Sequence, residues 1–154
     1  MIWKMPPRIK VLEAEGCLAD HRIKIVDQTD EKVKANVLSS SKEKTYNVYF
    51  YPQINAIWAD DNGSKWRGYL GYPSIALLML LNKIKYNLNI SQALKNIEWK
   101  KINTLNKGDY SKTEMFVKDK LGKEGRITSG EIDDEINSVL EQIKYLEMRK
   151  PGGA

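Results

Sequence analysis

Residues 71–82 of the chain are GYPSIALLMLLN, and this stretch decides the fold. Pro73 suits the first turn of a helix, where its missing N–H leaves no hydrogen bond unmade. The run from Ile75 to Leu81 is apolar on all sides, which predicts a buried helix at the centre of the protein. A membrane span needs about 20 apolar residues. This run is far shorter, so we expect no membrane partner.

Alternation of apolar and polar side chains predicts β-strands before this helix. The pattern covers residues 23–26, 33–37 and 46–51, and residues 56–58 predict a short fourth strand. Turn-forming residues at 27–30 and 39–42 separate the first three strands, so the short connections predict an antiparallel meander. Residues 8–15 suit a short helix ended by Gly16, with a strand as the alternative.

The segments after residue 90 are predicted to be helical. Residues 91–97, 99–105, 111–121 and 132–146 carry apolar side chains at helical spacing. Thr128 and Glu131 have the spacing of a capping box in front of the last helix. The predicted fold is therefore α+β, with a meander of about four strands packed on a central helix and a helical C-terminal half. We expect a β-meander and helix unit at 1–86, a helical extension at 87–150 and a disordered tail at 151–154.

Composition favours an intracellular protein with a cationic surface. The 154 residues include one cysteine, Cys17, so no intramolecular disulfide can form, and the N-terminus lacks the apolar region of a signal peptide. We expect a cytoplasmic location. The net charge is +5, and the excess of lysine lies in residues 76–107. Such an excess is typical of phosphate contact, although a thermophile-like composition rich in lysine and isoleucine would also explain it.

No catalytic or metal-binding motif is present in the sequence. Cys17 and His21 are four residues apart, but Gly16 should end the helix that would align them, so we expect a buried thiol and a surface imidazole. Residues 60–64, DDNGS, are typical of a tight turn with positive φ angles at Asn62 and Gly63. The glycines at 63, 68 and 71 match no nucleotide-binding loop. We predict no catalytic residue, no metal ligand and no cofactor.

An aromatic and basic segment is the best functional lead. Aromatic faces beside Lys or Arg are typical of proteins that bind single-stranded nucleic acid. The leading hypothesis is a non-enzymatic accessory protein that contacts single-stranded or structured nucleic acid, although the same aromatics could instead pack the loop on the sheet. The candidate binding residues are Lys65, Trp66, Arg67, Tyr69, Lys83, Lys85, Lys100 and Lys101.

A protein-interaction module is the alternative hypothesis. The last helix carries a long apolar stripe that could pair with another protein or with a second copy of the chain. Its candidate residues are Ile132, Ile136, Val139 and Ile143. An enzyme is the third hypothesis, and no triad, metal set or phosphate loop supports it.

Residues 21–82 resemble a SWIM-type zinc finger. The resemblance rests on the pattern Tyr46-x-Val48-x-Phe50, a short strand, an Asp-containing turn and residues 71–78, GYPSIALL. It implies nucleic-acid or protein binding. In that family a Cys-x-Cys pair and a Cys-x-His pair hold zinc, and here the corresponding positions are 56 and 58, or 57 and 59, and then 72 and 74. None of these residues is a zinc ligand, so the resemblance implies a metal-free relative.

Overall fold

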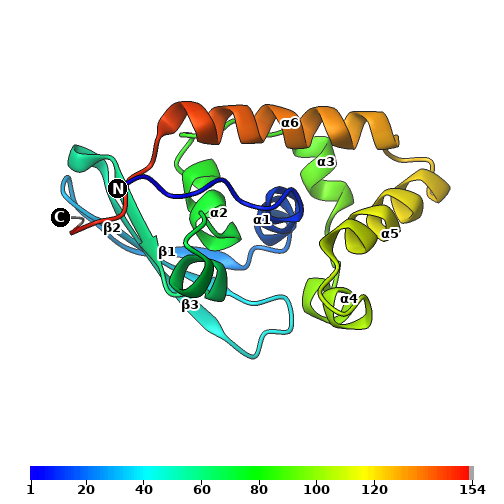
Figure 1. Ribbon diagram of the computed structural model, residues 1–154, viewed down its shortest axis with the longest axis horizontal. Helices are drawn as coiled ribbons and strands as arrows, with labels where there is room; N and C mark the ends of the chain where they lie inside the picture. The colour runs from blue at the N-terminus through cyan, green and yellow to red at the C-terminus, as the bar shows by residue number, and fades with distance from the viewer. Residues whose placement is uncertain (153–154) are drawn as a thin grey trace.

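The computed structural model describes residues 1–152 of the chain. These residues form a four-stranded sheet and a set of helices that lie together on one side of it (Figure 1). The elements in chain order are α1 (Ile9–Ala19), β1 (Ile23–Gln28), β2 (Val33–Leu38), β3 (Thr45–Tyr51), η1 (Pro52–Ile54), β4 (Ala56–Ala59), η2 (Gly63–Arg67), α2 (Tyr72–Leu80), α3 (Leu88–Ala93), α4 (Trp99–Leu105), α5 (Tyr110–Lys123) and α6 (Ser129–Leu146).

The sheet is the predicted antiparallel meander, with strand order β1-β2-β3-β4. On β2, the side chains of Val33, Ala35 and Val37 are buried while those between them are half-buried. This alternation arises because successive side chains of a strand point to opposite faces, and only one face meets the helices. The predicted α+β class is confirmed.

The helix α2 occupies the centre of the protein, as its sequence predicts. Its residues from Pro73 to Met79 are all buried, and the helix contacts α1 as well as β1, β3 and β4. Figure 1 shows α2 and α1 between the sheet and the helices of the C-terminal half. Such complete burial explains why residues 75–79 carry no polar side chain.

The first helix is longer than predicted, because Gly16 lies within α1 and does not end it. A Cβ atom at Gly16 would lie 2.8 Å from Nε1 of Trp99, so the glycine allows the indole of α4 to pack against the α1 backbone. Gly16 is therefore needed for close packing between two helices, and the prediction that it stops the helix was wrong.

Residues 60–64 do not form the predicted Asn-Gly turn. Asn62 has φ −60°, and Gly63 begins η2, a single turn of π-helix. The lack of a side chain at Gly63 is explained by Tyr69, whose ring would lie 2.4 Å from a Cβ atom there. The left-handed position comes at Gly68, with φ 72°, where the chain turns out of η2.

The C-terminal half is helical and continues the same core. Buried residues from both predicted units, among them Leu12 and Leu77 from the first and Leu94 and Ile136 from the second, belong to one hydrophobic cluster. The predicted capping box begins α6, with Thr128 and Glu131 bonded reciprocally. Of the predicted tail at 151–154, residues 151–152 form a turn, and 153–154 lie outside the described residues.

None of the helices within residues 1–152 combines the length and the apolar composition that a membrane crossing requires.

Candidate functional site

The π-helical turn η2 presents the most exposed aromatic side chain of the predicted binding segment. Trp66 is 74 % exposed, and the ammonium of Lys65 lies 5.3 Å from the centroid of its ring, over the face of the indole. Arg67 is also exposed, whereas Tyr69 is half-buried. The structure therefore brings Lys65, Trp66 and Arg67 to the surface together and turns Tyr69 inward.

Two further basic residues lie beside η2, although they are far from it in the sequence. The backbone N–H of Lys4 donates to the carbonyl of Gly68. The amine of Lys150 lies near the same glycine, 3.5 Å from the position that a Cβ atom of Gly68 would take. The same amine lies 4.8 Å from the centroid of the Trp3 ring. Sequence reasoning missed both lysines, because the proximity of residues 4 and 150 to this loop carries no local sequence signal.

The open face of the sheet carries a second aromatic and basic row. Lys34 on β2 pairs with Tyr49 on β3, which pairs with Trp58 on β4. The Tyr49 and Trp58 rings are 6.1 Å apart, and the amines of Lys32 and Lys34 lie 5.9 and 5.6 Å from the Tyr49 centroid. Since β4 contacts η2, this row and the Trp66 turn lie on neighbouring elements.

The remaining lysines of the predicted binding set are divided by the fold. Lys83 and Lys85 follow the C-terminal end of α2, where the Lys85 backbone bonds the side chain of Gln142 on α6. Tyr69, by contrast, precedes the N-terminal end of α2. Lys100 and Lys101 lie on α4 and face Glu43 and Glu98 at 3.5 and 3.7 Å, respectively. The eight residues therefore do not form one continuous surface.

The apolar stripe of α6 faces the core of this chain. Ile132, Ile136 and Val139 are fully buried, and Ile143 is 5 % exposed. These are the residues that the protein-interaction hypothesis placed on a surface. A partner could reach them only by opening the fold, because α1, α5 and the rest of the core already cover them.

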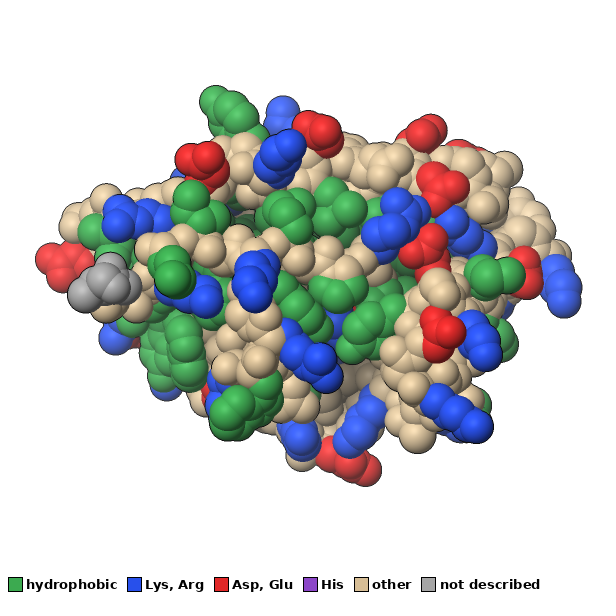
Figure 2. Space-filling model, viewed as in Figure 1, with side chains coloured by type: hydrophobic (Ala, Val, Ile, Leu, Met, Phe, Trp, Pro, Cys, Tyr) green, Lys and Arg blue, Asp and Glu red, His purple; other side chains and the backbone are tan. Residues whose placement is uncertain are grey.

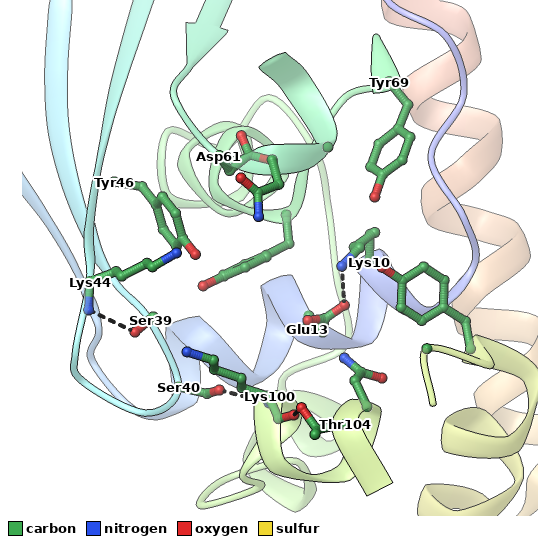
Figure 3. A pocket seen from close by; sticks show the side chains of 16 residues that line it. Lys10, Glu13, Ser39, Ser40, Lys44, Tyr46, Asp61, Tyr69, Lys100 and Thr104 are labelled. Atoms are coloured by element: carbon green, nitrogen blue, oxygen red, sulfur yellow. Dashed lines mark hydrogen bonds and ion pairs between the residues drawn. The ribbon is translucent and has the colours of Figure 1, made fainter. Parts of the chain in front are cut away.

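A cavity of about 350 Å³ lies between α1, the β2–β3 turn, η2 and α4. Figure 3 shows side chains from each of these elements converging on it. In Figure 2 this region is a hollow near the lower edge of the face, between the central body and the α4 side. Of the predicted binding residues, Tyr69 and Lys100 line the cavity. Its other functional groups come from segments that were predicted as helices, strand or turns and not as a binding site.

One wall of the cavity is an ion pair on α1. The amine of Lys10 lies 2.9 Å from Oε2 of Glu13 and 4.7 Å from the centroid of the Tyr110 ring. Burial would lower the pKa of Lys10, but the Glu13 carboxylate outweighs it and raises that pKa above its ordinary value. Burial also raises the pKa of Tyr69 to about 12, so this tyrosine stays neutral.

The opposite wall carries a buried carboxyl group and two tyrosines. Asp61 is 6 % exposed and accepts hydrogen bonds from the Ser64 hydroxyl at 2.7 Å and the Ser64 backbone N–H at 3.3 Å. Burial raises the pKa of Asp61 despite these bonds. The rings of Tyr46 and Tyr72 meet edge to face, with centroids 6.3 Å apart. The cavity thus combines amines, hydroxyls and aromatic faces.

Cys17 and His21 do not form a reactive pair. Cys17 is fully buried and His21 is exposed, as the sequence analysis expected. Burial raises the pKa of the Cys17 thiol to about 12, so the thiolate that a nucleophile requires is disfavoured.

A family model described as "Uncharacterised conserved protein UCP014422" matches residues 3–149. No curated protein and no solved structure matches the chain. The resemblance to a SWIM-type zinc finger is therefore wrong, since the match assigns almost the entire chain to a different family. Within residues 1–152, moreover, no three His, Cys, Asp or Glu side chains cluster as metal ligands would.

Proposed function

Because the chain belongs to the family described as "Uncharacterised conserved protein UCP014422", a description that names no activity, we propose a function from its surface chemistry: it is a non-enzymatic accessory protein that binds single-stranded nucleic acid. The observation that carries the proposal is the exposed indole of Trp66 with the Lys65 ammonium over its face. An aromatic face stacks a base of any sequence, and the adjacent amine neutralises a backbone phosphate.

The charges around this indole favour a polyanion. Lys65 and Arg67 flank it in the sequence, and Lys4 and Lys150 lie beside the Gly68 turn. Figure 2 shows Lys and Arg side chains among hydrophobic ones across the centre of this face, whereas the acidic side chains lie along its edges. Such a distribution attracts nucleic acid through release of counterions.

The open sheet face extends the same chemistry to a neighbouring element. Tyr49 and Trp58 lie side by side on it with two lysines over Tyr49. Exposed sheets with aromatic side chains stack successive unpaired bases in several RNA-binding folds. A single strand that lies on the sheet would reach Trp66 over the β4–η2 connection. Duplex grooves offer no such stacking, which is why the proposal specifies single strands.

Fluorescence anisotropy with labelled DNA and RNA oligonucleotides of about 12 nucleotides, a length that one small domain can bind, tests the proposal. Base stacking contributes roughly 1–3 kcal/mol, so Trp66→Ala should weaken binding by about 5-fold or more. The matched control is Tyr145→Ala, which removes another exposed aromatic from α6 and should leave the affinity unchanged. Equal losses in both variants, or no binding at high micromolar protein in low salt, would contradict the proposal.

The salt dependence of the same titration separates phosphate contacts from stacking. Each phosphate contact with a single strand contributes roughly −0.7 to the slope of log K against log salt. Lys65→Ala should therefore make the slope shallower, whereas Trp66→Ala should lower the affinity with little change of slope.

A further inference from the structure

The cavity beneath η2 has a chemistry that the proposed strand-binding surface does not use. Its volume of about 350 Å³ falls in the range of small-molecule sites. Lys10, Lys44 and Lys100 bring three amines to it, and four tyrosines and two carboxyl groups complete its walls. Figure 3 shows the Lys44 and Lys100 side chains reaching in from opposite elements, below Tyr46. The class of ligand follows from which of these charged groups already have a partner within the protein.

The aromatic and acidic groups on the α1 side are already occupied by a residue of the protein. Tyrosine rings beside a carboxylate form the kind of cage that holds an organic cation. Here the Lys10 ammonium fills that position, 2.9 Å from Glu13 and 4.7 Å from the Tyr110 centroid. A cationic ligand would have to displace this amine, so the cavity is not suited to one.

The amines on the other side lack a comparable partner. Lys44 makes no ion pair within residues 1–152, and Lys100 faces only Glu43, at 3.5 Å, with both side chains more than half exposed. Exposed pairs of this kind contribute little. The Ser40 hydroxyl oxygen accepts a bond from the Lys100 backbone N–H at 3.1 Å, which leaves its own proton available to donate. Two amines and a hydroxyl thus surround a position suited to a phosphate group.

Acceptor groups lie on the remaining walls. Within residues 1–152 the Asp61 carboxyl group bonds only Ser64, and the side-chain oxygen of Asn103 is buried with no hydrogen-bond partner. Unsatisfied buried acceptors are uncommon, and ligand N–H or O–H groups would satisfy them. The Tyr46 and Tyr72 rings offer apolar surface to a flat group.

From these groups we infer that the cavity binds a nucleoside monophosphate, with the phosphate between Lys44 and Lys100 and the base and sugar toward Tyr72 and Asp61. The nucleotide could be the end of a bound strand, because the cavity wall includes Asn62 and Gly63, where the Trp66 turn begins. In that case the inference rests on the proposed function. A free mononucleotide has the same chemistry.

Isothermal titration calorimetry with adenosine 5′-monophosphate and with adenosine tests the inference. The monophosphate should bind at least 5-fold more tightly than the nucleoside, and Lys100→Ala should abolish that difference. Lys95→Ala is the control: it removes an exposed lysine between α3 and α4 that lies outside the cavity lining, and it should change nothing. Circular dichroism of both variants verifies their fold.

The inference is overturned if the monophosphate does not bind, if it binds no better than adenosine, or if the Lys100 and Lys95 variants behave alike. Oligonucleotide binding that needs Trp66, without mononucleotide binding, would leave the proposed function standing alone. Mononucleotide binding without oligonucleotide binding would support the cavity site and contradict the proposed function. A strand with a 5′- or 3′-phosphate that binds more tightly than its unphosphorylated form, in a Lys100-dependent way, identifies the strand end as the source. Equal binding of all these strands identifies the free nucleotide.

Discussion

Glu15 is fully buried on α1, where a charged carboxylate would be strongly destabilising. Its carboxyl group lies close to that of Glu135 on α6, and Glu135 accepts the backbone N–H of Asn87 at 2.7 Å. Burial, and then this second carboxyl group, raise the pKa of Glu15 to about 10. Glu15 therefore stays protonated at neutral pH, which avoids repulsion between the two carboxyl groups of α1 and α6.

This raised pKa predicts that the protein loses stability as the pH rises. The unfolded chain releases the Glu15 proton near pH 4.3, whereas the folded chain retains it to about pH 10. The Glu15 contribution is therefore complete below pH 4 and is lost progressively between those two values. Glu15→Gln keeps a donor toward Glu135 and has no proton to lose, so it should raise the free energy of unfolding at pH 7 by roughly 3 kcal/mol.

Urea denaturation of the wild type and of Glu15→Gln across this pH range measures the effect. The gain in the free energy of unfolding that Glu15→Gln gives at pH 7 should shrink toward zero near pH 4. Glu141→Gln changes an exposed glutamate of α6 and serves as the control, with no comparable gain. An equal dependence of stability on pH in the wild type and in Glu15→Gln would show that Glu15 is not the titrating group.

At the scale of elements, glycine decides how closely neighbours pack. Gly71 precedes α2 with extended backbone, φ −77° and ψ 167°, a conformation open to any residue. Glycine is needed here because Asp61 packs directly against the backbone: a Cβ atom at Gly71 would lie 2.1 Å from Oδ2 of Asp61. The start of α2 thus lies directly against the carboxyl group that forms one cavity wall.

Gly71→Ala should push Asp61 and η2 away from α2 and lower the stability by about 1–3 kcal/mol, the usual cost of overpacking. Gly122→Ala is the matched control, because Gly122 lies in α5 with open space around its Cβ position. That change should stabilise the protein by about 0.4–1 kcal/mol. Denaturant midpoints of both variants measure the contrast, and a neutral Gly71→Ala would mean that the loop moves aside freely.

The separation of contacting residues along the sequence explains which element boundaries could be predicted. Thr128 was recognised as the start of α6 because its cap involves Glu131, only three residues away. The end of α1 was misplaced because the reason for Gly16 is Trp99, which is distant in the sequence. Local signals place an element end only when the partners of that end are also local.

At the scale of the whole molecule, the two predicted units share one core and an ionic network. Arg8, before α1, bonds Glu114 of α5 and Asp133 of α6, and Lys118 bonds the same two carboxylates. The segment before α1 also pairs with the one after α6, since the Trp3 N–H donates to the Met148 carbonyl. Contacts between the predicted units are therefore spread over the length of the chain.

This arrangement predicts a single cooperative unfolding transition. The tryptophan signal, with contributions from Trp3 and Trp58 in the first unit and Trp99 in the second, should change together with the helical circular dichroism signal. The calorimetric enthalpy should equal the van't Hoff enthalpy, as in two-state unfolding. Two resolved transitions would instead indicate that residues 1–86 and 87–150 fold independently.

The sequence by itself determined the meander, the buried helix from Pro73 and the capped last helix, because periodicity and capping depend on residues only a few positions apart. It also singled out Lys65, Trp66 and Arg67, which are adjacent in the chain. Only the tertiary structure decided that Tyr69 turns inward, that Lys83 and Lys85 lie at the far end of α2, and that the α6 stripe is core. The cavity likewise exists only in three dimensions, because Lys10, Tyr46, Asp61 and Lys100 come from distant segments that packing against α2 and α1 brings together.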